Sequence, residues 1–308
     1  MVRSFEIEVA APFRLDLTVW ALRRRPHNEV DSWDGSWYRR TLDLAGHPTE
    51  LAVRQPQSRV PLLVVELRRQ GRVGAGAADV AGHVLEGMLG LRVDLAPFYR
   101  MAEADQRLRP LVRRFEGMRP PRFPTVFEAL VNAVACQQLS LTVGIHLLNR
   151  LARSCGVPPA LDGSPPGFAT PERLGRSEVD LLRPLGFSAA KARALVGLAS
   201  RVAGGDLDLE ALRLADDDRA RAVLLSIPGI GRWSAEYTML RGLGRLEVLP
   251  GDDVGARNNL RRRFGLPASG GYDEVAELSR TWSPFGGLVY FHLLLDALAS
   301  AGHVAVPA

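Results

Sequence analysis

The spacing of apolar residues changes once along this chain of 308 residues, near residue 76. Before that point, segments within residues 4–70 alternate between apolar and polar side chains, and Asp34-Gly35 separates two of them. Alternation is typical of half-buried strands, and Asp-Gly between apolar stretches is typical of a tight turn. Beyond residue 76, apolar residues recur every three to four positions, which indicates helices. We therefore expect an α+β, mostly α fold, with an antiparallel sheet domain followed by helical domains.

The expected elements follow from this change of period. The strand-like segments are residues 5–10, 13–20, 37–46, 48–55 and 61–70. The helical segments are residues 77–90, 98–118, 125–136, 141–154, 177–185, 189–203, 217–226, 232–243, 254–265, 273–282 and 286–301. A proline-rich connector at 118–124 predicts a sheet domain over 1–117 and a helical domain over 118–308.

Three positions carry helix-start signals. Thr125, with Glu128 three residues later, fits a capping box, in which each residue satisfies a backbone N–H near the other. Ser177 and Ser188 stand where N-caps would begin the next helices. His146 and His292 lie in apolar helical surroundings, so we expect buried packing or hydrogen-bonding roles for them rather than metal ligation.

The composition excludes several classes of protein. Hydrophobic residues make up 46% and charged residues 24%, which is typical of a globular protein with a core. Cys136 and Cys155 are too few for a four-thiolate zinc or iron–sulfur site. The N-terminus lacks the apolar core of a signal peptide, and His292 and Asp296 interrupt the most apolar stretch, residues 285–302. We therefore expect no membrane association and a cytoplasmic location.

The charge of the chain is ambiguous, but its lysine content is informative. A formal net charge of +5 favours a polyanionic partner, because arginines neutralise phosphates. A chain rich in Arg, Ala, Gly and Leu is equally typical of GC-biased codons, which leaves both explanations open. Lys191 is the single lysine among 39 basic side chains. Any mechanism that requires a lysine side-chain amine therefore depends on this residue.

A Pro-Gly-Ile-Gly turn joins the helices expected at 217–226 and 232–243. Gly229 and Gly231 tolerate unusual backbone angles and let another backbone come close, because they have no Cβ. The second helix begins near Arg232, so its free N–H groups could bind a phosphate. An ordinary helical hairpin would need the same residues, so the turn alone leaves both interpretations open.

Two aspartates, Asp252 and Asp253, follow the hairpin at the start of the next expected helix. An aspartate at this place commonly accepts hydrogen bonds from the first helical N–H groups, which the helix dipole also favours. We expect this N-cap role for Asp252.

These motifs together resemble the helix–hairpin–helix DNA glycosylases. The hairpin at 227–231 with an aspartate one helix and one loop later carries the likeness, and residues 123–140 and 185–195 resemble the same superfamily. The chain is most similar to the AlkA type, DNA-3-methyladenine glycosylase II of bacteria, which has an N-terminal sheet domain. The resemblance covers most of residues 10–300 and is strongest over 123–295.

The resemblance implies a monofunctional hydrolase that removes alkylated purines, such as 3-methyladenine, in base excision repair and leaves an abasic site. Asp253 matches the family's catalytic aspartate, and Asp252 matches a helix-start or positioning group. A base alkylated at a ring nitrogen is cationic and leaves readily. One carboxylate that stabilises an oxocarbenium-like sugar or activates water is therefore sufficient, together with a pocket for the flipped base.

Trp233 determines the expected subtype. Superfamily members that also cut the strand carry a lysine at this hairpin position and form a Schiff base with it. Here the position is tryptophan, and Lys191 lies on another expected helix. The resemblance therefore implies a glycosylase without intrinsic lyase activity, and the cysteine count excludes the subfamily with an iron–sulfur cluster.

The resemblance assigns DNA contacts to the hairpin. Gly229 and Gly231, with the amides around Arg232 and Ser234, are expected to hold a phosphate near the lesion. Family members often bind a monovalent cation at hairpin carbonyls. We expect no other cofactor and no metal site.

The residues at the turn after the helix at 125–136 are expected to enter the duplex. Gln138, with Gln137 beside it, would fill the space that the flipped base leaves. A solvated polar turn is the alternative for these two residues.

Aromatic residues of the expected base pocket are only partly present. Trp233 and Tyr237, four residues apart on one helix face, match pocket positions of the family, although core packing explains the same spacing. Val254 follows the aspartate where the AlkA type has an aromatic residue, and Leu294 and Leu295 stand where aromatics are expected. These differences bear on the range of lesions.

We expect the partner to be double-stranded DNA that contains damaged bases, the protein to be a monomer, and its place to be the bacterial cytoplasm or nucleoid. Two alternatives remain open. One is a glycosylase of the same fold for deaminated or oxidised bases. The other is a non-catalytic DNA-damage-binding protein that uses the hairpin as a phosphate anchor.

Overall fold

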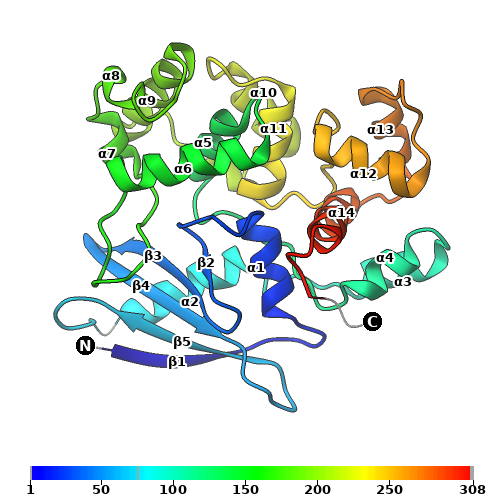
Figure 1. Cartoon of the computed structure of the whole chain (residues 1–308), viewed down its shortest axis with the longest axis horizontal. Coiled ribbons are helices and arrows are strands. Elements are labelled where there is room, and N and C mark those ends of the chain that lie inside the picture. The colour runs from blue at the N-terminus through cyan, green and yellow to red at the C-terminus, as the bar shows by residue number, and fades with distance from the viewer. Residues whose placement is uncertain (1, 75, 306–308) are drawn as a thin grey trace.

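The computed structural model describes residues 2–74 and 76–305, and over these residues it confirms the α+β, mostly α prediction. A five-stranded antiparallel sheet lies at the bottom of Figure 1 in this described part, and most helices lie above it or to its right. No helix within the described residues is both long and apolar enough to cross a membrane.

The sheet has the strand order β1-β5-β4-β3-β2. Its strands are β1 (Val2–Glu8), β2 (Ser32–Trp33), β3 (Tyr38–Leu44), β4 (His47–Arg54) and β5 (Leu62–Arg68). Between β2 and β3 the chain makes the predicted tight turn, because the Asp34 carboxylate accepts the N–H groups of Ser36 and Trp37. Leu51 and Val53 of β4 are buried on the side where α1 and α2 pack.

The prediction of a strand over residues 13–20 is wrong, because this segment belongs to the helix α1 (Leu15–Arg23). Leu15 packs in the core between the sheet and its helices, whereas Leu17 packs with the C-terminal helices. A helix buried on several sides loses the apolar stripe that distinguishes it from a strand, so apolar alternation alone was misleading here.

The remaining helices fall into three groups along the chain, and Figure 1 labels most of them. The helices before the proline-rich connector are α2 (Ala77–Met88), α3 (Ala96–Ala104) and α4 (Arg109–Arg114). Above the sheet lie α5 (Val126–Cys136), α6 (Leu141–Cys155), α7 (Pro171–Gly175), α8 (Val179–Leu182), α9 (Ala189–Ala203), η1 (Glu210–Arg213), α10 (Asp217–Ser226), α11 (Arg232–Thr238) and the π-helical η2 (Met239–Leu243). The C-terminal group is α12 (Val254–Phe264), α13 (Tyr272–Arg280) and α14 (Gly286–Ser300).

The boundary between residues 117 and 118 stays a prediction. Helices α3 and α4 precede it, but they pack on the C-terminal helices: Phe98 and Phe115 share one core cluster with Leu260 and Leu288. The C-terminal group therefore completes its core with helices from the other side of the connector.

The helix-start predictions have mixed outcomes. Thr125 and Ser188 are N-caps, since their hydroxyl oxygens accept the N–H groups of Glu128 and Lys191. The reciprocal half of the capping box is absent, because the Glu128 carboxylate binds an arginine instead. Ser177 is not an N-cap, because its hydroxyl donates to the Arg173 carbonyl. The next helix, α8, begins at Val179, so Glu178 rather than Ser177 stands at the N-cap position.

Arg40 of β3 connects the sheet to the helical part. Its buried guanidinium donates to Asp31 at 2.6 Å and to both oxygens of Glu128 on α5. Burial opposes a charge here, but the carboxylates of Glu128 and Asp31 raise the pKa of Arg40 well above its ordinary value. This ion-pair network fixes α5, and with it the turn that follows α5, relative to the sheet.

Candidate active site

The hairpin between α10 and α11 has one backbone conformation that requires glycine. Gly229 has a φ of +84°, as predicted for an unusual angle. The same prediction for Gly231 is wrong, because its φ of −98° is ordinary extended backbone. A Cβ built at Gly231 would have no atom within 4 Å, so the space beside the start of α11 is open to another molecule.

The other two hairpin residues differ in exposure. Arg232 is exposed, its Nε donates to Asp252 at 2.7 Å, and its guanidinium lies 3.6 Å from the ring centroid of Tyr272. Ser234 is buried, and its hydroxyl accepts the Gln137 side-chain amide at 2.9 Å. No side chain caps the first N–H groups of α11, so they remain available to an anion.

Asp253 uses its two carboxylate oxygens differently. Oδ1 accepts the N–H of Ala256 at 2.8 Å, which makes Asp253 the N-cap of α12. Oδ2 lies 3.3 Å from Trp233 Nε1 and 3.2 Å from the Tyr290 hydroxyl, and both groups donate to it. The structure therefore brings Trp233 of the hairpin helix into direct contact with the predicted catalytic aspartate.

Asp252 has the role of an ion-pair partner, so its predicted role as an N-cap is wrong. Its carboxylate binds Arg232 at 2.7 Å and Arg257 at 2.5 Å. The side chain points to these guanidinium groups and leaves the helix start to Asp253. Asp252 thereby connects the hairpin helix to α12.

Glu236 fixes the loop that carries the two aspartates. Its buried carboxylate, on α11, accepts the N–H of Gly251 at 3.1 Å and the hydroxyl of Tyr272 at 2.6 Å. A Cβ at Gly251 would lie 2.8 Å from the Tyr272 ring, so the loop can approach this closely only with glycine. Glu236 was not identified from the sequence, because an acidic residue in a helix gives no sign of its partners.

The predicted aromatic pair is present on α11. The rings of Trp233 and Tyr237 are 5.4 Å apart at an interplanar angle of 33°. Trp233 is half-buried and reaches Asp253, whereas Tyr237 is buried and its hydroxyl accepts Arg24 at 2.6 Å. Tyr237 therefore lies beneath Trp233, towards the interior.

Two buried arginines lie near Tyr237. Arg24 donates to Tyr237 and Asn132, and Arg241 donates to backbone carbonyls of α1 while its guanidinium lies 5.7 Å from the Tyr237 ring centroid. Among the described residues, neither arginine has a carboxylate within ion-pair distance. The interior behind the aromatic pair therefore carries positive charge that only neutral groups contact.

The three residues that differ from the family pattern are exposed to different degrees. Val254 is 68% exposed beside Asp253, and Leu294 is half-buried. Leu295 is completely buried in the C-terminal core cluster. Tyr290, on the same helix, supplies the aromatic contact that the sequence did not reveal.

The two glutamines after α5 have different roles. The Gln137 side-chain amide donates to the Gly229 carbonyl at 2.9 Å and to Ser234, so it braces the hairpin. Gln138 is exposed with a φ of +55°, and Leu139 beside it is 43% exposed. Of the two glutamines, Gln138 alone projects from the turn. Leu139 is a second candidate, since apolar side chains commonly enter between bases.

Lys191, on α9, stabilises the same turn through hydrogen bonds. Its Nζ donates to the carbonyls of Ala135 at 3.1 Å and Gln137 at 2.7 Å, at the end of α5. Burial lowers the pKa of this amine. The single lysine of the chain therefore stabilises the turn that presents Gln138.

The predictions for the two histidines have different outcomes. His292 is buried on α14 and its Nδ1 lies 2.8 Å from the Leu288 carbonyl, which confirms a packing and hydrogen-bonding role. His146 is exposed, contrary to the expected burial, and stacks on His27 at 4.1 Å. Burial lowers the pKa of His292 to about 4.

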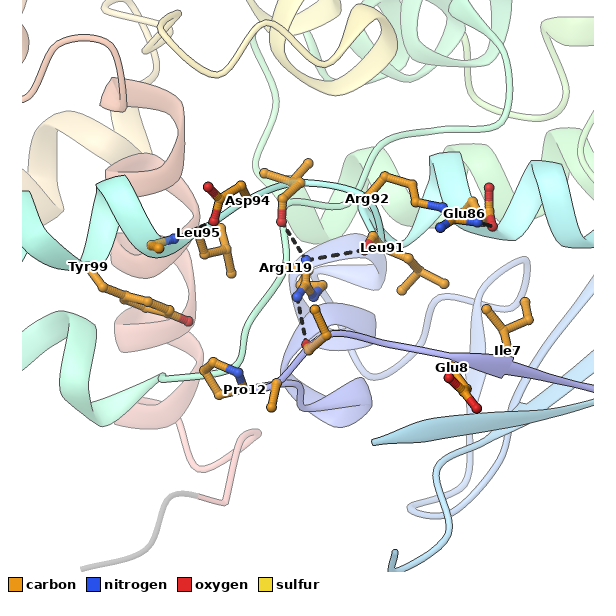
Figure 2. Close-up of a pocket in the computed structure, with 14 residues that line it drawn as sticks. Ile7, Glu8, Pro12, Glu86, Leu91, Arg92, Asp94, Leu95, Tyr99 and Arg119 are labelled. Carbon is orange, nitrogen blue, oxygen red and sulfur yellow. Dashed lines mark hydrogen bonds and ion pairs between the residues drawn. The ribbon is translucent and has the colours of Figure 1, made fainter. Parts of the chain in front are cut away.

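A cavity of about 360 Å³ lies outside this site, between β1 and the segment after α2 (Figure 2). Arg119 borders it, but its guanidinium donates to the carbonyls of Leu91, Val93 and Ala10. These bonds hold the segments together, and none of the hairpin residues, Asp252 or Asp253 lines the cavity.

Metal-binding side chains are not grouped anywhere in the described part of the chain: no three His, Cys, Asp or Glu residues lie together. At the hairpin, carbonyl oxygens are ligands that hard cations accept, but the Gly229 carbonyl already accepts the Gln137 amide. The monovalent cation therefore stays a prediction.

Comparison with known proteins identifies relatives over most of this architecture. Residues 131–284 match the family model described as HhH-GPD superfamily base excision DNA repair protein. A DNA-3-methyladenine glycosylase of Bacillus subtilis is 31% identical over 65% of this chain and 66% of its own length. For three curated bacterial relatives, the match to this chain spans 55% to 66% of the relative's own length.

Solved structures extend the similarity to the sheet. The 3-methyladenine DNA-glycosylase from Archaeoglobus fulgidus has a TM-score of 0.83 and 26% identity, covering 96% of this chain and 99% of that chain. The 3-methyladenine DNA glycosylase of Schizosaccharomyces pombe, in complex with abasic DNA, has a TM-score of 0.55 and 27% identity. That match covers 64% of this chain and 94% of that one.

Proposed function

Because the chain belongs to the HhH-GPD superfamily of base excision DNA repair proteins, we propose that it is a DNA glycosylase that releases alkylated purines such as 3-methyladenine. The observation that carries this proposal is the position of Asp253. A half-buried carboxylate begins α12, contacts Trp233 of the hairpin helix and lies close to an open helix N-terminus. The relatives named as 3-methyladenine glycosylases support the same substrate class.

The chemistry would depend on one carboxylate. A purine alkylated at N3 or N7 is cationic, so the glycosidic bond breaks with positive charge developing on the sugar. Asp253 would stabilise that charge or orient the attacking water, and the base would leave as a neutral molecule. The indole face of Trp233 would attract a cationic base once it has left the stack.

We propose that the enzyme has no lyase activity. A strand-cutting relative needs an amine at the hairpin, and this chain has Trp233 there. The amine of Lys191 donates to two carbonyls at the end of α5, which supports a structural role for it. Borohydride in the presence of abasic DNA should therefore trap no covalent adduct, and a strong adduct would contradict this part of the proposal.

DNA would bind across the hairpin and the turn after α5. The free N–H groups at the start of α11 would hold a phosphate, and Gln138 or Leu139 would enter the duplex. We propose damaged double-stranded DNA as the partner, a monomer as the active form and the bacterial cytoplasm as the place of action. A monovalent cation at the hairpin carbonyls would strengthen the phosphate contact.

The buried arginines favour a second substrate class, deaminated purines. A neutral base such as hypoxanthine must leave with negative charge, and positive charge from Arg24 and Arg241 beyond Tyr237 would stabilise it. A cationic base leaves as a neutral molecule, so these arginines would not stabilise its departure.

The test is base release from a panel of duplexes that each carry one lesion: 7-methylguanine, 3-methyladenine, hypoxanthine or 8-oxoguanine. We expect release of the alkylated purines. Release of hypoxanthine alone would favour the second class, and release of no base with retained binding to abasic DNA would favour a non-catalytic binding protein.

A further inference from the structure

We propose that Tyr290 is a positioning residue for Asp253: the Tyr290 hydroxyl fixes the carboxylate in its working orientation. This inference rests on the proposed glycosylase activity. Tyr290 lies on α14, 37 residues after the aspartate in sequence, and no spacing pattern connects the two.

The geometry gives Asp253 donors from three elements. Ala256 N–H holds Oδ1 from α12, and Trp233 Nε1 and the Tyr290 hydroxyl donate to Oδ2 from α11 and α14. A carboxylate held by one donor can rotate, whereas donors on both oxygens fix the plane of the group. Tyr290 supplies one of the two side-chain donors, and Trp233 is expected to exchange part of its contact for the substrate base.

Tyr290 is well suited to remain a donor. It is 8% exposed, and its ring packs edge-on against Phe291 at 5.9 Å. Burial and the negative charge of Asp253 raise the pKa of Tyr290 well above its ordinary value, so the hydroxyl keeps its proton at every working pH. A neutral phenol can donate to the carboxylate without adding a charge to the site.

The experiment compares Tyr290→Phe with wild type on a duplex that carries one 7-methylguanine. Phenylalanine keeps the ring packing and removes only the hydroxyl. Tyr99→Phe is the matched control, because it removes a half-buried hydroxyl that accepts the Gly117 N–H and makes no hydrogen bond to Asp253. We expect kcat to fall about tenfold in Tyr290→Phe, the value of one hydrogen bond to a charged group, with KM changed less than twofold.

The split between kcat and KM separates positioning from general structural damage. Loss of the donor to the Asp253 carboxylate should lower kcat in Tyr290→Phe while KM stays within about twofold, and Tyr99→Phe should keep both values. A Tyr290→Phe enzyme with wild-type kcat, or one whose KM rises as much as its kcat falls, would overturn the inference. Absence of base release by the wild type would instead contradict the proposed function itself.

Discussion

The Asp253 side chain has two roles: it caps α12, and in the proposed reaction it is the catalytic carboxylate. One oxygen caps α12, which orients the carboxylate along the helix start, while the other faces Trp233 and Tyr290. The capping role and the site role are thus compatible, although the sequence suggested that they would be divided between Asp252 and Asp253. Asp252 instead forms ion pairs with the guanidinium groups of Arg232 and Arg257.

Single residues at this site could be predicted only where a local motif marks them. The resemblance of the hairpin to the helix–hairpin–helix glycosylases pointed to Trp233 and Asp253, and the structure places them in contact. Tyr290 and Glu236 could not be found in that way, because their partners are distant in sequence and packing alone brings them together. The exposed Leu139 was not among the predicted residues, because the role of entering the duplex was assigned to the polar glutamines next to it.

Glu236 should prove essential for holding the aspartate loop. Replacing it with glutamine keeps its shape but weakens the charged hydrogen bonds to the Gly251 N–H and the Tyr272 hydroxyl. We expect Glu236→Gln to lower the free energy of unfolding by about 1–3 kcal/mol and to slow base release. Denaturant unfolding and single-turnover assays measure the two effects; Glu277→Gln, at an exposed ion pair, should change neither.

His292 should make stability depend on pH. Its pKa is about 4 in the folded protein and 6.5 when exposed, so between these values the unfolded chain binds more protons. Stability should therefore fall as pH decreases from 6.5 to 4, by about 3 kcal/mol in total. Denaturant unfolding at several pH values measures this loss. In His292→Leu the decrease should be smaller, and an equal decrease in both proteins would contradict the assignment.

At the scale of elements, most helices were predictable from the sequence, and α1 was an exception. Thr125 and Ser188 mark their helices through local hydrogen bonds that any context would allow. The helix α1 lies between the sheet cluster and the C-terminal cluster, and the alternation of apolar residues over 13–20 favoured a strand there. Ser177 failed as a cap because its hydroxyl found a carbonyl one turn earlier.

The turn between α5 and α6 should depend on Lys191. In Lys191→Met, two carbonyls at the end of α5 lose their donor, at a cost of about 1 kcal/mol. We expect weaker binding to abasic DNA by severalfold, because Gln138 and Leu139 are presented less rigidly. Fluorescence anisotropy measures the affinity. Arg193→Met removes an exposed charge from the same helix, and an equal loss of affinity there would indicate simple electrostatics.

At the scale of the whole molecule, the buried network around Arg40 joins the sheet to the helical part. The order of sheet and helices was predictable from the change of period at residue 76. The docking of the two parts was not, because Arg40, Asp31 and Glu128 meet only in the folded chain. The same holds for α3 and α4, which pack on helices almost two hundred residues away.

Removal of Arg40 should destabilise the molecule strongly. Arg40→Met leaves Asp31 and Glu128 buried without their partner, which should lower the free energy of unfolding by about 3–5 kcal/mol. Arg39→Met, which removes a more exposed ion pair with Asp34, should cost about 1 kcal/mol or less. Equal losses in the two variants, measured by denaturant unfolding, would show that the network adds nothing to stability.

The most direct test of the whole account is single-turnover release of 7-methylguanine by wild type, Asp253→Asn and Asp252→Asn. We predict that the wild type releases the base, that Asp253→Asn is slower by about a hundredfold or more, and that Asp252→Asn keeps most of the activity. Binding to abasic DNA should survive in Asp253→Asn. Equal rates for the wild type and Asp253→Asn would contradict the assignment of this carboxylate to base release.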